Sequence, residues 1–295
     1  MSFSNEVKAE LLSLQLKKNC CKKALLLGLL YNADIDKSGV GSAEFFSLDA
    51  AKSAAELLGA VASPNITDMV RGGRHYYKLE FSSKSLASFA YKVENGESIY
   101  KAAAFRCEIC YAAFIRGVLI SSSAVNDPRK GYHLEIALSA DNAARLPALA
   151  KVIEYNGFEP KMLTREKKVS VYFKSNTQIS DLLSFAGAMR SSFDFANVCI
   201  ERDIRNNENR ATNCVAKNIS KSVGATRKQI DAINKLIECH RFDLLSKELA
   251  ETATLRLENE DISLAELARL HEPPITKSGL SHRLAKICEL ALECE

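Results

Sequence analysis

Two apolar segments with a glycine near the centre stand out in the hydrophobic pattern of the chain. The first covers residues 21–36 around Gly28, and the second covers residues 110–128 around Gly117. Each pattern predicts a largely buried helix, in which a central glycine costs about 1 kcal/mol relative to alanine. We expect these glycines to allow close backbone contact where the two helices cross.

The same order of predicted elements follows each glycine-bearing helix. The first is followed by a strand at 43–48, a helix at 49–58, strands at 65–70 and 75–81, and a helix at 83–91. The second is followed by a strand at 132–138, a helix at 141–155, strands at 159–163 and 169–173, and a helix at 176–185. This repetition predicts a pseudo-two-fold α+β domain at 20–187, with repeats at about 20–95 and 107–187. An amphipathic helix at 2–18 is expected to dock on it.

Residues 205–228 combine basic side chains with asparagines. The segment holds six basic residues, one acid and five asparagines, and its apolar positions form only a narrow stripe on a polar helix. One interpretation is a solvated helix between domains. The other is a surface that lies on nucleic acid, with cations on phosphates and amides on the backbone or base edges. The candidate DNA-binding residues here are Arg205, Asn206, Arg210, Asn213, Lys217, Lys221, Arg227 and Lys228.

The residues from 226 onward are predicted to be helical throughout. Helices are expected to begin at a Thr226–Gln229 capping box, near Asp243, at a Ser263–Glu266 capping box and near Ser278. The last two would form a helix-turn-helix at about 262–292.

The last predicted helix buries Leu280, Leu284 and Ile287 and carries polar residues on its other face. Lys277 and Ser278 at its N-terminus are candidates for phosphate contact. His282, Arg283 and Lys286 are candidates for the major groove, with Arg283 on a guanine. The alternative for these side chains is an ordinary solvated helix face.

Composition limits the possible functions. The 295 residues suggest about two domains, and the net charge of +4 places the basic character in local segments. With no secretory signal, the nine cysteines are expected to be reduced thiols in the cytoplasm. Cys107 and Cys110 form one CxxC pair, but no second pair has zinc-finger spacing, so we expect structural thiols, no metal site and no cofactor. The longest apolar run, at 24–30, is too short to cross a membrane.

The glycine-bearing helices resemble the paired motifs of LAGLIDADG homing endonucleases. Residues 26–34 (LLGLLYNAD) lie on the first motif, and residues 115–123 (IRGVLISSS) lie on the second. In active nucleases of that family, the eighth motif position carries an acid that holds a divalent metal. Those positions are Ala33 and Ser122 in this chain. The resemblance therefore implies that the chain has the LAGLIDADG fold but not the metal-dependent nuclease activity, and that it has no catalytic residue.

A residual nuclease is the enzymatic alternative. It would have to use Asp34, Asp36 and Asp127, which are the carboxylates nearest to the two motif ends. Helix-end or loop roles are the simpler explanation of these three residues.

Over nearly the whole chain, the sequence resembles the WhiA family of bacterial transcription regulators linked to cell division. The resemblance rests on RNNENRATNCVAKNISKS at 205–222, QIDAI at 229–233 and PPITKSGLSHRLAKI at 273–287. It implies a degenerate LAGLIDADG-like domain, a linker helix and a helix-turn-helix bound to double-stranded DNA. It also implies a nucleoid-associated regulator of transcription in cell division, chromosome segregation or sporulation.

The expected organisation has four parts: an N-terminal helix at 1–19, the duplicated domain at 20–187, the basic linker helix at 188–225 and the DNA-binding domain at 226–295. A third hypothesis is an interaction scaffold. In that case the duplicated domain binds a regulatory protein partner, and DNA contact is secondary.

Overall fold

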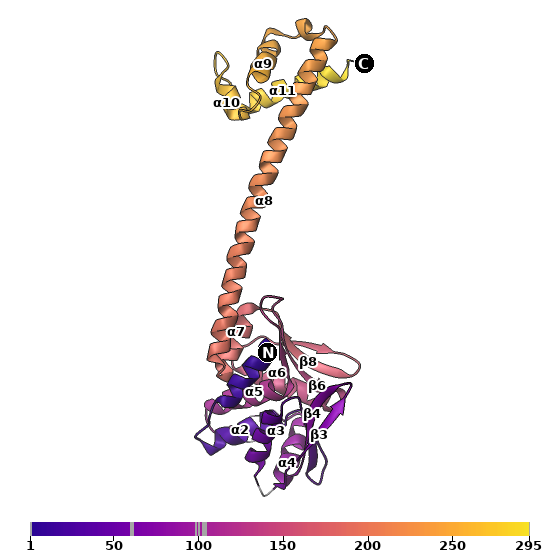
Figure 1. Cartoon of the computed structure of the whole chain (residues 1–295), viewed down its shortest axis with the longest axis vertical. Helices are drawn as coiled ribbons and strands as arrows, with labels where there is room; N and C mark the ends of the chain where they lie inside the picture. Colours follow the sequence, from indigo (N-terminus) through magenta and orange to yellow (C-terminus); the bar gives the residue numbers. More distant parts are fainter. Residues whose placement is uncertain (1, 60–61, 98, 100, 102–104, 295) are drawn as a thin grey trace. The chain divides into compact units, whose positions relative to one another are not determined.

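Two units make up the structure, residues 1–203 and residues 204–295 (Figure 1). The computed structural model describes residues 2–59, 62–97, 99, 101 and 105–294. The first unit contains two four-stranded antiparallel sheets with helices, and the described residues of the second unit form helices without strands. The predicted fold class, a duplicated α+β domain followed by a helical domain, is confirmed.

The two repeats have the same topology. The first consists of α2 (Asn19–Leu29), β1 (Asp34–Ile35), β2 (Val40–Phe45), α3 (Leu48–Leu58), β3 (Asn65–Arg71), β4 (Arg74–Ser82) and α4 (Lys84–Glu94). The second consists of α5 (Ile109–Ser122), β5 (Ser123–Val125), β6 (Leu134–Ser139), a 3-10 helix (Ala140–Arg145), α6 (Leu146–Tyr155), β7 (Lys161–Thr164), β8 (Lys168–Phe173) and α7 (Asn176–Ala186). The strand orders, β1-β2-β4-β3 and β5-β6-β8-β7, match position by position.

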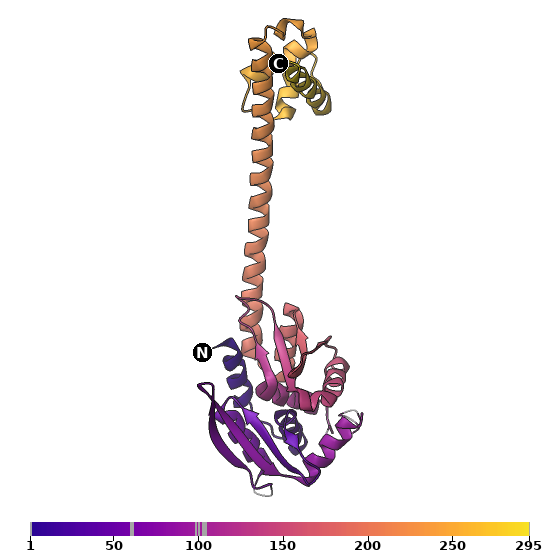
Figure 2. The ribbon, with the colours of Figure 1, turned by 90° about the vertical axis from the view of Figure 1, so that its right-hand side faces the viewer.

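Helices cover the sheets on their apolar faces. In the first repeat, α3 packs on β2, β3 and β4 (Figure 2). Inward residues alternate with outward ones along the strands, as in β6, where Leu134, Ile136 and Leu138 are buried. The hydrophobic pattern does not predict β1 and β5, because two or three residues are too few to show an alternation.

The crossing of α2 and α5 is the centre of the first unit. A Cβ atom added to Gly28 would lie 2.1 Å from the carbonyl oxygen of Phe114. One added to Gly117 would lie 2.3 Å from the carbonyl oxygen of Leu25. Both distances are far inside van der Waals contact, so the predicted close approach of the two backbones at these glycines is confirmed.

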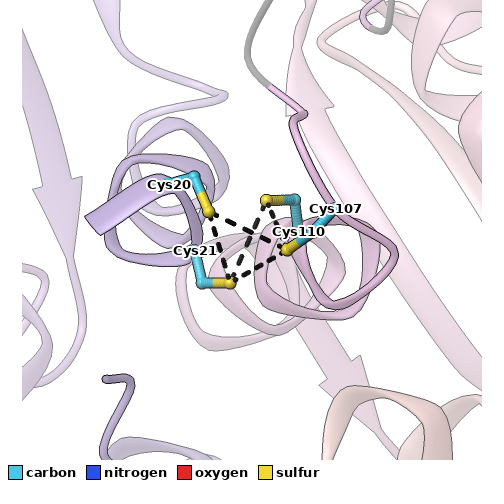
Figure 3. A group of neighbouring side chains, drawn as sticks. All are labelled: Cys20, Cys21, Cys107 and Cys110. Atoms are coloured by element: carbon cyan, nitrogen blue, oxygen red, sulfur yellow. Dashed lines mark hydrogen bonds between the residues drawn. The ribbon is translucent and has the colours of Figure 1, made fainter. Parts of the chain in front are cut away.

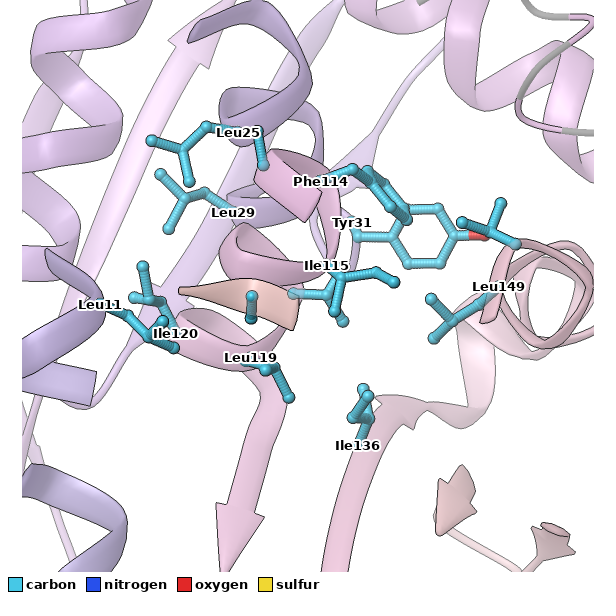
Figure 4. Packing of buried hydrophobic residues seen from close by; sticks show 14 of the residues in the cluster. Leu11, Leu25, Leu29, Tyr31, Phe114, Ile115, Leu119, Ile120, Ile136 and Leu149 are labelled. Atoms are coloured by element: carbon cyan, nitrogen blue, oxygen red, sulfur yellow. The ribbon is translucent and has the colours of Figure 1, made fainter. Parts of the chain in front are cut away.

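Apolar side chains surround this crossing (Figure 4). Tyr31 packs edge-on against Phe114 with 5.3 Å between the ring centroids. Its hydroxyl donates a 2.7 Å hydrogen bond to the backbone carbonyl of Arg145. The tyrosine therefore links the end of the first motif helix to the second repeat, and its buried hydroxyl is satisfied.

Helix α1 (Phe3–Ser13) docks on the duplicated domain through Val7 and Leu11. It ends at Ser13 and does not reach residue 18, so the predicted end of this helix is wrong. The carboxylate of Glu10 accepts hydrogen bonds of 2.8 Å from the backbone N–H groups of Arg190 and Ser191. These are first-turn donors of α8 (Met189–Glu238), which have no partner inside their own helix. The contact anchors the start of α8.

The second unit has its own apolar core. It is formed by the C-terminal part of α8 with α9 (Lys247–Glu258), α10 (Leu264–Arg269) and α11 (Lys277–Leu292). Ile233, Leu236, Leu267, Leu284 and Ile287 are at its centre. Among the described residues, no helix is both long enough and apolar enough to span a bilayer.

Two predicted helix starts in this unit are wrong, and the other two, at Ser263 and near Ser278, are confirmed. Thr226 is inside α8 and does not cap a helix, because the helix continues from Met189 to Glu238 without a break. Its hydroxyl accepts a hydrogen bond from the buried guanidinium of Arg256. The helix expected near Asp243 begins at Lys247, after a 3-10 turn at Phe242–Leu244. The Ser263–Glu266 capping box is present at α10.

Candidate nucleic-acid interface

Six of the eight DNA-binding candidates in the basic segment lie on one face of α8. They are Asn206, Arg210, Asn213, Lys217, Lys221 and Lys228. Their spacings of 4, 3, 4, 4 and 7 residues match the helical repeat, so the side chains project in nearly the same direction. We call these six residues the basic face of α8. It is about 27 Å long between Arg210 and Lys228, at 1.5 Å per residue.

Arg205 and Arg227 lie elsewhere on the helix. With 100° per residue, Arg227 is displaced by about 80° and Arg205 by about 120° from the centre of the basic face. All eight side chains are exposed. Six of the eight candidates thus share one face of the helix, and Arg205 and Arg227 do not. The residue types alone do not reveal this division.

The cations of the basic face have no acidic partner. Among the described residues, no carboxylate lies within salt-bridge distance of Arg210, Lys217, Lys221 or Lys228. Residues 205–228 contain six basic residues and one acid, whereas residues 229–295 contain eight basic and thirteen acidic residues. The positive charge of the second unit is therefore concentrated on α8, which favours contact with phosphate there.

Helix α11 begins with a side-chain cap. The hydroxyl of Thr276 caps it by accepting a 3.1 Å hydrogen bond from the backbone N–H of Gly279. Lys277, Ser278, His282 and Lys286 are exposed, while Leu280, Leu284 and Ile287 are buried. The predicted division of the helix into an apolar face and a polar face is confirmed for these residues.

Arg283 is not fully outward, and this expectation is wrong. Its side chain is 22% exposed, and its Nη2 lies 3.1 Å from Oε2 of Glu248 on α9. Lys286 is paired with Glu289, one turn further along the same helix. The guanidinium of Arg283 has five N–H donors, so the pairing with Glu248 leaves others for a base edge. Arg283 lies at the border between α11 and α9, and His282 and Ser278 lie on the outward face.

Three cations on the sheets of the first unit are paired with carboxylates. Arg71 pairs with Glu44 at 3.1 Å, Lys78 with Glu80 at 2.7 Å, and Lys168 with Glu135 at 3.2 Å. Phosphate would have to compete with each of these carboxylates. These three paired cations are therefore less available to phosphate than the unpaired cations on the basic face of α8.

Comparison with known proteins finds a matching family model for each of the two units. The model of the WhiA LAGLIDADG-like domain matches residues 111–205, and the model of the WhiA C-terminal HTH domain matches residues 209–291. Together the two models cover more than half of the chain in the expected order. The chain belongs to the WhiA family.

Relatives in this family support the assignment. The "Probable cell division protein WhiA" of Lachnoclostridium phytofermentans is 41% identical over 182 residues, which is 62% of this chain and 58% of that protein. The protein of the same name from Clostridium tetani is 38% identical over 181 residues, covering 61% and 56% of the two chains. The chain thus spans less than two thirds of the length of these relatives. The fold is similar to that of full-length DUF199/WhiA from Thermotoga maritima, with a TM-score of 0.56, 24% identity and 99% of both chains covered.

The helix end of the first LAGLIDADG-like motif carries a guanidinium. Arg145, which is 3% exposed, donates hydrogen bonds of 2.7 Å to the carbonyl of Ala33 and 3.1 Å to that of Tyr31. Its Nη2 also pairs with Glu94 at 2.8 Å. Ala33 is the eighth position of the first motif, where the resemblance to active nucleases would place a metal-binding acid. A buried cation already satisfies the carbonyls at this point.

The remaining carboxylates near the motif ends have local partners. Asp34 accepts a 3.1 Å hydrogen bond from the Asn142 amide. The Ser38 hydroxyl and nearby backbone N–H groups hold the pKa of Asp36 below its ordinary value. Asp127 accepts a 2.9 Å hydrogen bond from the backbone N–H of Arg129. These contacts agree with roles in loops and helix ends.

One group of residues in the WhiA-type domain was missed by the sequence reasoning. Cys20 and Cys21 from the first repeat meet Cys107 and Cys110 from the second (Figure 3). A signal for this contact was present in the sequence. Cys21 and Cys110 each precede the crossing glycine of their helix by seven residues. Because the glycines touch, cysteines at equal distance from them come together.

Proposed function

We propose that the chain is a non-catalytic DNA-binding regulator in which the basic face of α8 holds the phosphate backbone and α11 enters the major groove. The observation that carries this proposal is the row of unpaired cations on α8, in the same unit as a helix-turn-helix. Phosphate contacts supply affinity and position, and a helix in the major groove supplies sequence preference. The names of the relatives support a role in cell division, which we propose to be exercised through transcription at the chromosome.

The charge of the helix-turn-helix segment indicates how α8 and α11 contribute to DNA binding. The segment 229–295 contains more acids than bases, so α11 has little electrostatic attraction beyond its own N-terminal turns. We infer that α11 contributes specificity and that α8 contributes most of the affinity. Lys277 and Ser278 at the start of α11 would contact phosphate together with the N-terminal backbone N–H groups of the helix.

Arg283→Ala tests the role of α11 in recognition. A preferred site is first selected from a random DNA pool with the full chain, and affinities are then measured for this site and a scrambled duplex. Loss of a bidentate guanine contact should weaken binding to the selected site by about 1–3 kcal/mol and relax the preference at one base pair. Glu248→Gln is the matched control, because it frees Arg283 and should not weaken binding. An equal loss on both duplexes after Arg283→Ala would show that this residue does not read a base.

No hydrolysis of DNA is expected, because Ala33 and Ser122 replace the two metal-binding acids and Arg145 occupies one helix end. The measurement is nicking of supercoiled plasmid by the full chain with magnesium or manganese, beside an active LAGLIDADG nuclease. Nicking that disappears in Asp34→Asn would contradict the prediction and revive the nuclease alternative.

A regulatory protein partner on the LAGLIDADG-like domain is a compatible second proposal. It is favoured by large apolar side chains that are exposed on the first sheet or directly after one of its strands. Phe46 is 77% exposed and Val70 is 62% exposed. A protein surface that carries such residues is a candidate docking site.

A further inference from the structure

We propose that Cys20, Cys21, Cys107 and Cys110 form a four-thiolate site for one zinc ion. All four Sγ atoms lie within 4.8 Å of one another. Cys20 and Cys21 are in the first turn of α2, Cys107 lies two residues before α5, and Cys110 is in the first turn of α5. The four side chains point toward a common centre between the two helices (Figure 3).

The distances between the sulfur atoms fit a single tetrahedral ion. The Sγ–Sγ distances are 4.0 Å for Cys20–Cys21, 3.8 Å for Cys20–Cys107, 3.6 Å for Cys21–Cys107, 3.9 Å for Cys21–Cys110 and 3.5 Å for Cys107–Cys110. Zinc–thiolate bonds of about 2.3 Å in a tetrahedron place the sulfurs about 3.8 Å apart. A disulfide would bring two of them to about 2.05 Å. These five distances scatter around the edge length of a ZnS4 tetrahedron, and the sixth, Cys20–Cys110, is at most 4.8 Å.

The surroundings favour thiolates at this position. Cys21 is 2% exposed and Cys110 is fully buried, so an ionised thiolate there needs a compensating positive charge. The N-terminal ends of α2 and α5 both face the cluster, and each contributes partial positive charge from its free N–H groups. The partial charges of two helix ends do not balance four thiolates, whereas a divalent ion at the centre adds two full positive charges.

The donor set also indicates which ion binds and what it does. Four soft thiolates in a tetrahedron select zinc over magnesium, calcium or manganese. A closed set of four protein ligands leaves no open position for a substrate, so the site is structural. It joins ligands from two repeats that are 86 to 90 residues apart in sequence. The ion would fasten the starts of α2 and α5 to each other, on the same helix pair that touches at Gly28 and Gly117.

The first test uses the unaltered full chain. Protein purified from zinc-supplied cells without chelator should contain one equivalent of zinc by mass spectrometry of the metal. After removal of zinc under reducing conditions, titration with Co²⁺ should give the intense thiolate-to-cobalt absorption and visible bands of a tetrahedral four-sulfur site, saturating at one equivalent. A folded chain with neither bound zinc nor these bands overturns the proposal, and so does an iron-loaded site that rejects zinc.

Variants then assign the ligands. Cys20→Ser and Cys107→Ser, at the two partly exposed positions, should each weaken zinc binding by at least about 100-fold, since loss of a mere outer-shell partner already costs 10–100-fold. Cys214→Ser is the matched control, because Cys214 is exposed on α8 and outside the cluster. Circular dichroism checks that each variant is folded. Equal affinities in all three variants would overturn the ligand assignment. A metal-free wild-type mass four hydrogens below that of the reduced chain would replace the zinc site with two disulfides.

Discussion

Gly28→Ala should lower the free energy of unfolding of residues 1–203 by about 3 kcal/mol or more. The added methyl group would lie 2.1 Å from the Phe114 carbonyl oxygen and 2.9 Å from the backbone of Gly117 and Val118. Overpacked sites usually cost about 1–3 kcal/mol, and here the obstacle is backbone, which cannot rotate away. For a unit of this size, the melting temperature should fall by about 10 °C. Gly117→Ala should act similarly, because its methyl would lie 2.3 Å from the Leu25 carbonyl oxygen.

Gly224→Ala is the control for this prediction. Gly224 is on α8, and a Cβ atom there meets nothing within 4 Å. The same chemical change should therefore stabilise the helix by up to about 1 kcal/mol through its higher helix propensity. The measurement is thermal unfolding of the full chain, monitored by calorimetry and by circular dichroism. Similar melting temperatures for Gly28→Ala and the unaltered chain would mean that the two helices separate easily at their crossing.

The glycine crossing was predictable because the cost of a helical glycine is a local property. Gly28 and Gly117 lower the stability of their own helices. This cost is offset by close contact between the two helix backbones, which a side chain at the crossing would prevent. The duplicated fold follows from the same pair, since each glycine helix precedes the same order of elements. Exact helix ends were less predictable. Thr226 looked like a cap by its residue type, but its hydroxyl binds Arg256 from another helix.

The long-range contacts of the site residues could not be predicted from the sequence. A helical projection places Arg283 on the polar side of α11, but its partner Glu248 is 35 residues earlier on α9 and is visible only in the structure. The meeting of the four cysteines was not predicted for a related reason. Zinc-finger spacing was sought along the chain, whereas the second pair of thiols comes from the other repeat. In both cases the decisive contact is long-range, and periodicity carries no information about it.

Replacing Arg210, Lys217, Lys221 and Lys228 with glutamine should reduce DNA affinity on the order of 1,000-fold at about 0.1 M salt. Each phosphate contact releases counterions and contributes about 0.9 to the slope of log K against log salt, so four lost contacts should lower that slope by about 3 to 4. Glutamine keeps a helix propensity close to that of arginine and lysine. The loss should be the same for selected and scrambled duplexes, because phosphates carry no sequence information.

The control for net charge removes the same number of cations from the first unit, by changing the exposed Lys37, Lys52, Lys130 and Lys167 to glutamine. This variant should keep most of the affinity and of the salt slope. Affinity is measured by fluorescence anisotropy at several salt concentrations. If the two fourfold variants lose affinity equally, only overall charge matters, and α8 has no special role.

The neighbours Arg227 and Lys228 allow the sharpest test of the basic face. They differ by one position in the sequence and are both exposed, yet only Lys228 lies in line with Lys217 and Lys221. Lys228→Gln should lower the salt slope by about 0.9, and Arg227→Gln should lower it by much less. A helix that touches DNA along one side requires this difference. If both substitutions have the same effect, the phosphates surround α8 or approach it from another side, and the face assigned to Asn206, Arg210 and Asn213 is wrong as well.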